Sequence, residues 1–213
     1  MRKRLKLVAV LVIALTVFMG MSLTVFADGS KGGIKVRSEY SANFYGVMCV
    51  LVEVENTNPF DTSVTMNAIS MNANGKKIES DAANDILFMN PGDVYMLVAV
   101  LPNSAKATNY DYDLIVDTKH DFYDPVAAGD DVDAKASDDG RGNVTIYATN
   151  KASSVVEARG MVVFYNKGTI VDFQEAYLSN DADCLMSPGE STTETVCTDA
   201  AYDSIALYVT AVK

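Results

Sequence analysis

The 213-residue chain contains no tryptophan, one histidine and three cysteines. The lack of tryptophan argues against a glycosidase or a sugar-binding site built on indole rings, although eleven tyrosines are present. The single histidine, His120, cannot form a multi-histidine metal site, and no nucleophile motif lies beside it to complete a triad. Three cysteines are too few for a disulfide-based fold. We therefore expect no enzyme and no catalytic, cofactor-binding or metal-binding residues.

Basic residues are also scarce, since 17 Lys and Arg stand against 28 Asp and Glu. Four of the basic residues and none of the acidic ones lie in residues 1–27, so the rest of the chain has 13 basic and 28 acidic residues, a formal charge of −15. Such a chain lacks the basic surface of a nucleic-acid binder. We interpret this negative charge as a contribution to solubility and not as the sign of a specific cationic partner.

The first 27 residues have the three parts of a secretory signal. Four of residues 2–6 are basic, an uncharged apolar run extends from Leu7 to Phe26, and Val25 and Ala27 place small residues before a cleavage site at Asp28. An uncleaved anchor is the alternative, because about twenty apolar residues can span a bilayer core of roughly 30 Å. We expect a secreted or cell-surface protein, attached to the membrane only if this segment is retained.

Strand patterns dominate the remaining residues. Runs rich in β-branched and aromatic residues are bounded by Asn, Gly, Pro or Asp, and no apolar stripe of helical period lasts for three turns. The clearest runs are 44–54, 94–101, 144–149, 161–165 and 205–212. This pattern predicts an all-β fold, and the length after the signal suits two antiparallel sandwiches.

The second half of the chain repeats the order of features in the first half. Each half has a strand that ends in Asn, a turn with Gly, a Pro-Gly-acid turn and a Tyr-Asp pair before the last strand. In the first half these are Asn56, Gly75, residues 91–93 and Tyr112-Asp113. In the second half they are Asn150, Gly168, residues 188–190 and Tyr202-Asp203. We predict two tandem immunoglobulin-like β-sandwich domains, residues 28–122 and 123–213, with the boundary in the acidic segment 120–131.

The Pro-Gly-acid turns have a specific expected geometry. Proline followed by glycine favours a type II turn, because proline fixes φ and glycine supplies the positive φ. Tight hairpins need the opposite twist. We therefore predict that each turn is a corner between two sheets and that the acid, Asp93 or Glu190, caps or solvates it.

This order of features resembles the FxLYD family of bacterial cell-envelope domains, which are immunoglobulin-like β-sandwiches. The similarity is greater in the second copy, where VVFYNKG at 162–168 stands in the place of the family's Phe-x-Leu-Tyr-Asp strand and turn. Val162, Phe164 and Asn166 depart from that motif, and AISMNANG at 68–75 keeps only its outline. The resemblance implies a fold and a cell-envelope location, and it supplies no catalytic residues.

Acidic residues gather near the predicted boundary, at Asp121, Asp124, Asp130, Asp131 and Asp133, with Asp138, Asp139 and Asn143 further on. Crowded oxygen ligands suit calcium, which takes about six to eight of them. Their spacing fits no known calcium loop, so solvated charges are the preferred interpretation. A calcium-dependent adhesin-like tandem stays an alternative, and a carboxylate-dependent hydrolase is a weaker one.

Two cysteines flank the second Pro-Gly-acid turn. An oxidising compartment would allow a disulfide between Cys184 and Cys197 across this corner. A hairpin centred on the turn would instead pair Cys184 with Thr193 and misalign Cys197. Cys49 lies within an apolar run and is expected in the core.

The sequence as a whole predicts an exported, non-catalytic binding or structural module of the bacterial cell envelope or exterior. Its loops or a strand edge would contact an envelope protein or a glycan. We expect no cofactor and no nucleic-acid partner.

Overall fold

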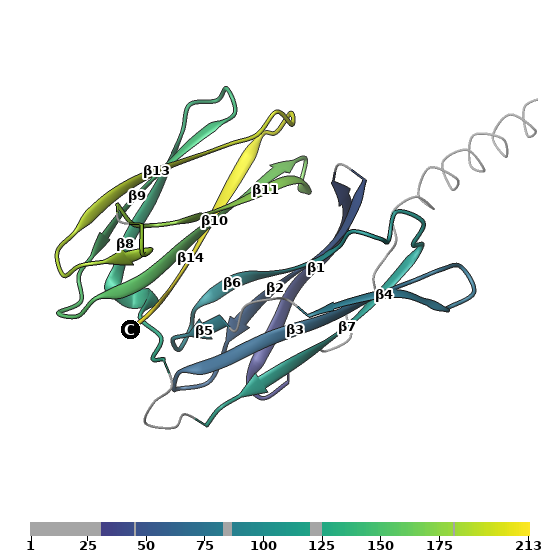
Figure 1. Ribbon diagram of the computed structural model, residues 1–213, viewed down its shortest axis with the longest axis horizontal. Coiled ribbons are helices and arrows are strands. Elements are labelled where there is room, and N and C mark those ends of the chain that lie inside the picture. Colours follow the sequence, from purple (N-terminus) through teal and green to yellow (C-terminus); the bar gives the residue numbers. More distant parts are fainter. Residues whose placement is uncertain (1–30, 45, 83–86, 120–124, 181) are drawn as a thin grey trace, which may run out of the picture.

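The computed structural model describes residues 31–44, 46–82, 87–119, 125–180 and 182–213, which form fourteen β-strands and one short 3-10 helix (Figure 1). The predicted signal, His120 and the predicted boundary between residues 122 and 123 lie outside these residues. No helix in the described part of the chain is long and apolar enough to cross a membrane. The all-β prediction is confirmed, and the neighbouring strands pair in antiparallel fashion.

The first half of the chain forms two sheets. Its strands are β1 (Ile34–Phe44), β2 (Val47–Asn56), β3 (Thr62–Met71), β4 (Lys77–Ala82), β5 (Leu87–Met89), β6 (Val94–Leu101) and β7 (Asn109–Asp117). Sheet A has the order β1-β2-β6. Sheet B has the order β4-β3-β5, with β7 also paired to β3.

The second half forms two further sheets after the 3-10 helix η1 (Gly129–Asp131). Its strands are β8 (Val132–Asp138), β9 (Asn143–Asn150), β10 (Val156–Asn166), β11 (Thr169–Tyr177), β12 (Leu185–Met186), β13 (Ser191–Cys197) and β14 (Ser204–Val212). Sheet C has the order β11-β10-β12 with β14 paired to β10, and sheet D has the order β13-β9-β8. Sheet D therefore matches sheet A, and sheet C matches sheet B. The two halves share one topology, and their origin as copies of one module stays a prediction.

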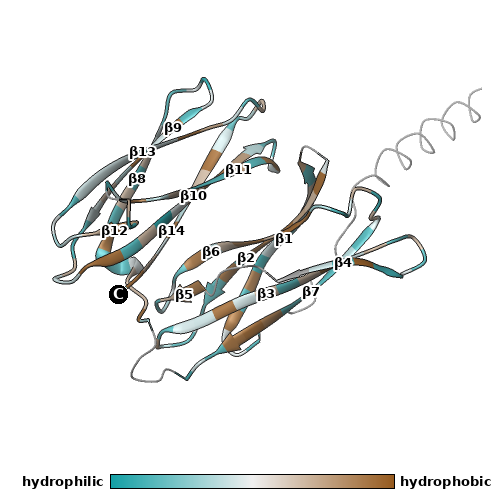
Figure 2. Ribbon diagram, in the orientation of Figure 1, coloured by the Kyte–Doolittle hydropathy of each residue, from teal (hydrophilic) through white to brown (hydrophobic). Residues whose placement is uncertain are grey.

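The four sheets stack in the order B, A, C, D. Sheets A and B enclose one apolar core, and sheets C and D enclose a second one. The first core continues into sheet C through four residues, Met161, Val163, Ile170 and Tyr208. Sheets A and C therefore face each other, as the side-by-side sandwiches in Figure 1 also show. In Figure 2 the hydrophobic colours lie mainly on the strands, and most loops are hydrophilic.

The central strands of sheets A and C are buried on both faces. In β2, residues 48–52 are all buried, and in β10 the same holds for residues 160–164. A strand covered on both faces has a continuous apolar sequence, whereas a strand covered on one face alternates. The runs VMCVLV and MVVF in these strands follow from the stacking of the two sandwiches.

Each Pro-Gly-acid turn carries the chain from one sheet to the other. The first joins β5 of sheet B to β6 of sheet A, and the second joins β12 of sheet C to β13 of sheet D. In the first turn Gly92 has φ of +85°, and the Asp93 N–H donates to the Asn90 carbonyl oxygen at 3.1 Å. This pattern agrees with a type II turn. The Asp93 carboxylate accepts from the Asn90 N–H at 2.7 Å, so the corner and its acidic cap are confirmed.

A buried asparagine at the end of the neighbouring strand forms hydrogen bonds to each corner. The Asn56 side-chain amide donates to the carbonyl oxygens of Phe60 at 3.0 Å, Met89 at 3.0 Å and Asn90 at 3.2 Å, and its oxygen accepts from the Asn58 N–H at 3.0 Å. The second half repeats these four bonds around Asn150, with Ser154, Met186, Ser187 and Ala152 as partners. The repeated sequence features thus coincide with a repeated set of hydrogen bonds.

The Tyr-Asp correspondence between the halves is wrong. Tyr112-Asp113 lies in the middle of β7, where it pairs with Asn67 and Ala68 of β3, whereas residues 202–203 precede β14. The strand alternation of β7 places aspartates on one face and Tyr110, Tyr112 and Leu114 on the other. An aspartate can stand within a strand when its side chain faces solvent. A Tyr-Asp pair can therefore lie in the middle of a strand, and it does not mark where the strand begins.

Candidate functional site at the junction of the two sandwiches

The junction between sheets A and C combines aromatic contacts, a polar network and a groove. Its apolar part includes two aromatic pairs that cross between the sandwiches. The rings of Phe44 and Phe173 meet edge to face with centroids 5.6 Å apart, and those of Tyr95 and Tyr208 do so at 6.0 Å. Edge-to-face packing at these distances is favourable for aromatic rings. The junction is therefore packed like a core.

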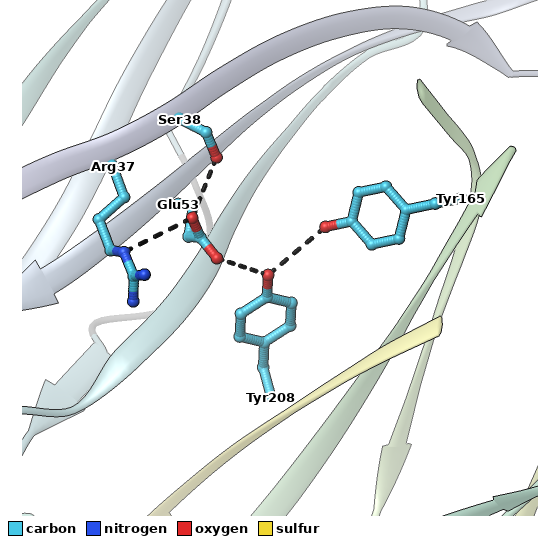
Figure 3. A network of polar contacts seen from close by, with 5 residues as sticks. All are labelled: Arg37, Ser38, Glu53, Tyr165 and Tyr208. Carbon is cyan, nitrogen blue, oxygen red and sulfur yellow. Dashed lines mark hydrogen bonds and ion pairs between the residues drawn. The ribbon is translucent and has the colours of Figure 1, made fainter. Parts of the chain in front are cut away.

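A polar network lies inside this apolar contact (Figure 3). The Tyr208 hydroxyl of sheet C donates to Glu53 Oε1 of sheet A at 2.8 Å, and Tyr165 Oη lies 3.5 Å from Tyr208 Oη. The other carboxylate oxygen of Glu53 accepts from the Ser38 hydroxyl at 3.1 Å and lies 3.9 Å from Arg37 Nε. The network joins β1 and β2 of the first sandwich to β10 and β14 of the second.

The tyrosines of this network act as neutral hydrogen-bonding groups. Burial raises the pKa of Tyr208 far above its ordinary value, and its contacts with Tyr165 and Glu53 raise it further. Burial also raises the pKa of Tyr165. Tyr208 therefore keeps its proton throughout the physiological pH range and donates to the Glu53 carboxylate, a charge-assisted bond that is stronger than a neutral one.

A groove of about 370 Å³ lies beside this contact and is lined by both sandwiches. One wall belongs to the first sandwich and is apolar, with Leu87, Phe88, Met96, Val98 and Val100. The other wall belongs to sheet C, with Glu157, Arg159, Phe173, Glu175, Thr210 and Val212. Its volume lies within the range of about 300 to 1,000 Å³ that is typical of ligand sites.

The charged wall of the groove is ordered by its own contacts. Arg159 Nη2 lies 2.8 Å from Glu157 Oε1, and the Arg159 guanidinium carbon lies 4.8 Å from the centre of the Tyr177 ring. Thr210 Oγ1 donates to the Phe88 carbonyl oxygen at 3.3 Å and so connects the two walls. With two carboxylates and one guanidinium, the groove has a formal charge of −1.

The acidic residues near the predicted boundary make separate local contacts. Asp131 pairs with Lys213 at 2.7 Å, and Tyr202 donates to Asp138 at 2.6 Å. Hydrogen bonds from Asn143 and from the Arg141 backbone lower the pKa of Asp139. Within the described ranges no three His, Cys, Asp or Glu side chains are grouped so that they could hold a metal ion, and Asp121 and Asp124 lie outside those ranges.

The three cysteines are free thiols in the structure. Cys49 is buried, as predicted, and burial raises the pKa of its thiol to about 11. Cys184 precedes β12 of sheet C, three residues before the corner, whereas Cys197 ends β13 of sheet D. The seven residues of β13 carry Cys197 about 23 Å from the corner, so the two thiols are out of register for the hypothetical disulfide.

The groove was not found from the sequence. The continuous apolar runs of β2 and β10 indicate that both faces of these strands are covered, which was a usable signal for stacked sandwiches. The groove residues offer no such signal, since Glu157 and Arg159 alternate with buried Val156 and Ala158 as in any strand with one solvent face. Their role depends on what lies opposite.

No family model matches the sequence, and no curated protein matches it. Among solved structures, red sea bream transglutaminase matches with 12% sequence identity and a TM-score of 0.27. The match covers 84% of this chain and 29% of that protein's chain, so this chain spans less than a third of its length. A likeness of this size carries no argument about function.

Proposed function

We propose that this protein is an exported, non-catalytic binding module of the bacterial cell envelope or exterior, similar to FxLYD domains, whose partner is an envelope protein or a glycan. The groove at the junction carries this proposal, because both sandwiches build it and neither alone encloses it. Binding sites occur preferentially where two domains meet. The secretory pattern of residues 1–27 supports export.

The contacts around the groove suit recognition by a preorganised surface. The Glu53 to Tyr208 bond, the aromatic pairs and the Thr210 to Phe88 bond hold the two walls in one arrangement. A rigid site loses little conformational freedom when a ligand binds, which increases affinity. The ionic groups on the charged wall already have partners within the protein, as the Glu157 to Arg159 pair shows. The arrangement thus favours binding over acid-base chemistry.

Site-specific photocrosslinking in the producing cell tests this function. A photoreactive amino acid with a small aliphatic diazirine side chain, close to valine in size, at position 100 reports on the groove without filling it, and the same amino acid at position 147, on the outer face of sheet D, is a matched control. Val100 is 41% exposed and Tyr147 is 42% exposed, so chance collisions should label them alike. We expect position 100 to give a discrete crosslinked envelope component. Equal labelling at both positions, or turnover of envelope polysaccharide by the purified protein, would contradict the proposal.

A further inference from the structure

The two walls of the groove differ in chemistry. The first sandwich contributes an apolar wall, with Met96, Val98 and Val100 on β6 and Leu87 on β5. Sheet C contributes a wall whose charged groups are Glu157, Arg159 and Glu175. A ligand that fills the space between them must be apolar on one side and polar on the other.

We propose that the groove binds an extended polypeptide segment of a partner protein in which basic and apolar residues alternate. This inference rests on the proposed function and adds the chemistry of the partner. In an extended chain successive side chains point to opposite sides. Alternation therefore directs the apolar side chains to the β6 wall and the basic ones to the sheet C wall.

The charge of the groove selects a basic segment. Two carboxylates and one guanidinium line it, so a cation that enters the groove meets a net negative charge. A second copy of this chain is a poor occupant, since the chain has a formal net charge of −11 and like charges repel.

The groove also continues an existing protein contact. Residues of β14 pack against β5 and β6 where the sandwiches meet, and the same strands supply Thr210, Val212, Leu87 and Met96 to the groove. An inserted segment would therefore extend the contact between the two sandwiches. Its apolar side chains would cover Val98 and the 41% exposed Val100.

Fluorescence anisotropy with a labelled synthetic peptide tests the inference. The probe is a hexapeptide that alternates valine and lysine, and a block peptide with three valines followed by three lysines has the same composition and charge. We expect the alternating peptide to bind more tightly than the block peptide to the chain from residue 28 onward. The double variant Glu157→Gln with Glu175→Gln should weaken binding of the alternating peptide by about tenfold, since it removes two charge contacts.

A matched variant separates the groove from the general charge of the protein. Asp133→Asn with Asp199→Asn removes two exposed carboxylates from the same sandwich outside the groove, and it should leave the affinity within about twofold. Val100→Trp places a large side chain in the groove beside the apolar wall, so it should weaken binding without a change in charge. Equal losses in both carboxylate variants, or equal binding of the two peptides, would overturn the inference. If those results occur while position 100 still crosslinks to an envelope component, the binding function stands and only the ligand chemistry is wrong.

Discussion

Sheets A and D occupy the same place in the topology of their sandwiches, yet their outer faces are opposite in character. With Asn56 and Asn150 as equivalent positions, Leu51 of β2 corresponds to Thr145 of β9, and Glu53 corresponds to Tyr147. Leu51 is fully buried against sheet C, whereas Tyr147 is 42% exposed. The same fold therefore presents a contact surface in one half and a solvent surface in the other.

The outer face of sheet D is a regular polar array. Thr193, Tyr147 and Lys135 form one cross-strand row, and Lys135 Nζ lies 5.7 Å from the centre of the Tyr147 ring. Hydroxyl groups of neighbouring strands also contact each other, as between Thr149 and Ser191 at 2.8 Å. Strand β9 therefore alternates between these polar, outward-facing side chains and the buried residues Val144, Ile146 and Ala148. Topology is repeated between the halves, and the outer-face residues decide which sheets meet.

The largest expected change in stability comes from placing the same charge on each of the two outer faces. Leu51→Asp places a charge in the buried contact between sheets A and C and should lower the free energy of unfolding by about 4 kcal/mol or more. Thr145→Asp makes the same change at the equivalent position of the uncovered face and should cost less than about 1 kcal/mol. Chemical denaturation of the two variants measures both values. Similar losses would show that sheet D is also covered.

The corner asparagines should behave alike, because their bonds are the same. Asn56→Ala and Asn150→Ala each remove four hydrogen bonds from a buried site and leave backbone carbonyls without donors, so each should cost about 3 kcal/mol. Denaturation curves of the two single variants provide the test. A difference of more than about 2 kcal/mol between them would break the equivalence of the two corners.

The polar network should couple the sandwiches by a smaller amount. A double-mutant cycle with Glu53→Gln and Tyr208→Phe should give a coupling free energy of about 1.5 kcal/mol, because it removes one charge-assisted bond from a part-buried site. Tyr147→Phe, at the position equivalent to Glu53, serves as a control and should change stability by less than about 0.5 kcal/mol. Additive effects of the two network substitutions would show that the bond does not link the sandwiches.

The smallest expected effect is a pH-dependent difference between the two turn acids. Burial, with Asp130 and Asp61 nearby, raises the pKa of Asp93, whereas a hydrogen bond from the Ser187 N–H lowers the pKa of Glu190. A raised carboxyl pKa favours the folded protein at low pH and loses that contribution as pH rises through the folded pKa. A lowered one contributes stability above the unfolded pKa and loses it as pH falls.

Charge removal at the two corners should therefore have opposite signs at neutral pH. Asp93→Asn keeps an oxygen acceptor for the Asn90 N–H and should raise the melting temperature at pH 7, whereas Glu190→Gln should lower it. At pH 3 the effect of Asp93→Asn should shrink, since the raised pKa leaves the wild-type carboxyl mostly protonated there. The effect of Glu190→Gln should shrink less, since the lowered pKa keeps that carboxyl ionised to lower pH. Melting temperatures at the two pH values test this, and a stabilising Glu190→Gln at pH 7 would contradict the assignment.

The features that the sequence predicted well are those with a local cause. Apolar runs located the cores of β2, β6, β9, β10 and β14, and the Pro-Gly pairs located both corners. Strand β1 was missed although its sequence IKVRSEYSANF alternates between apolar and polar residues, with Ser38 as the exception. Its register also shifts near that residue, between Val36 and Ser38. The Tyr-Asp pairs misled because a dipeptide on a solvent face has no fixed relation to the strand start. The groove was missed because its walls come from strands far apart in the chain.

The sequence by itself determined that the chain forms strands, where it turns between sheets, and which strands are covered on both faces. Residue periodicity and the φ preferences of proline and glycine act over a few residues, so they can be read directly. Only the tertiary structure decided which surfaces meet. Glu53 and Tyr208 are 155 residues apart, and neither position has a local signal that names the other. The junction and its groove arise when sheets A and C pack, since that contact places the apolar β6 wall opposite the charged wall of sheet C.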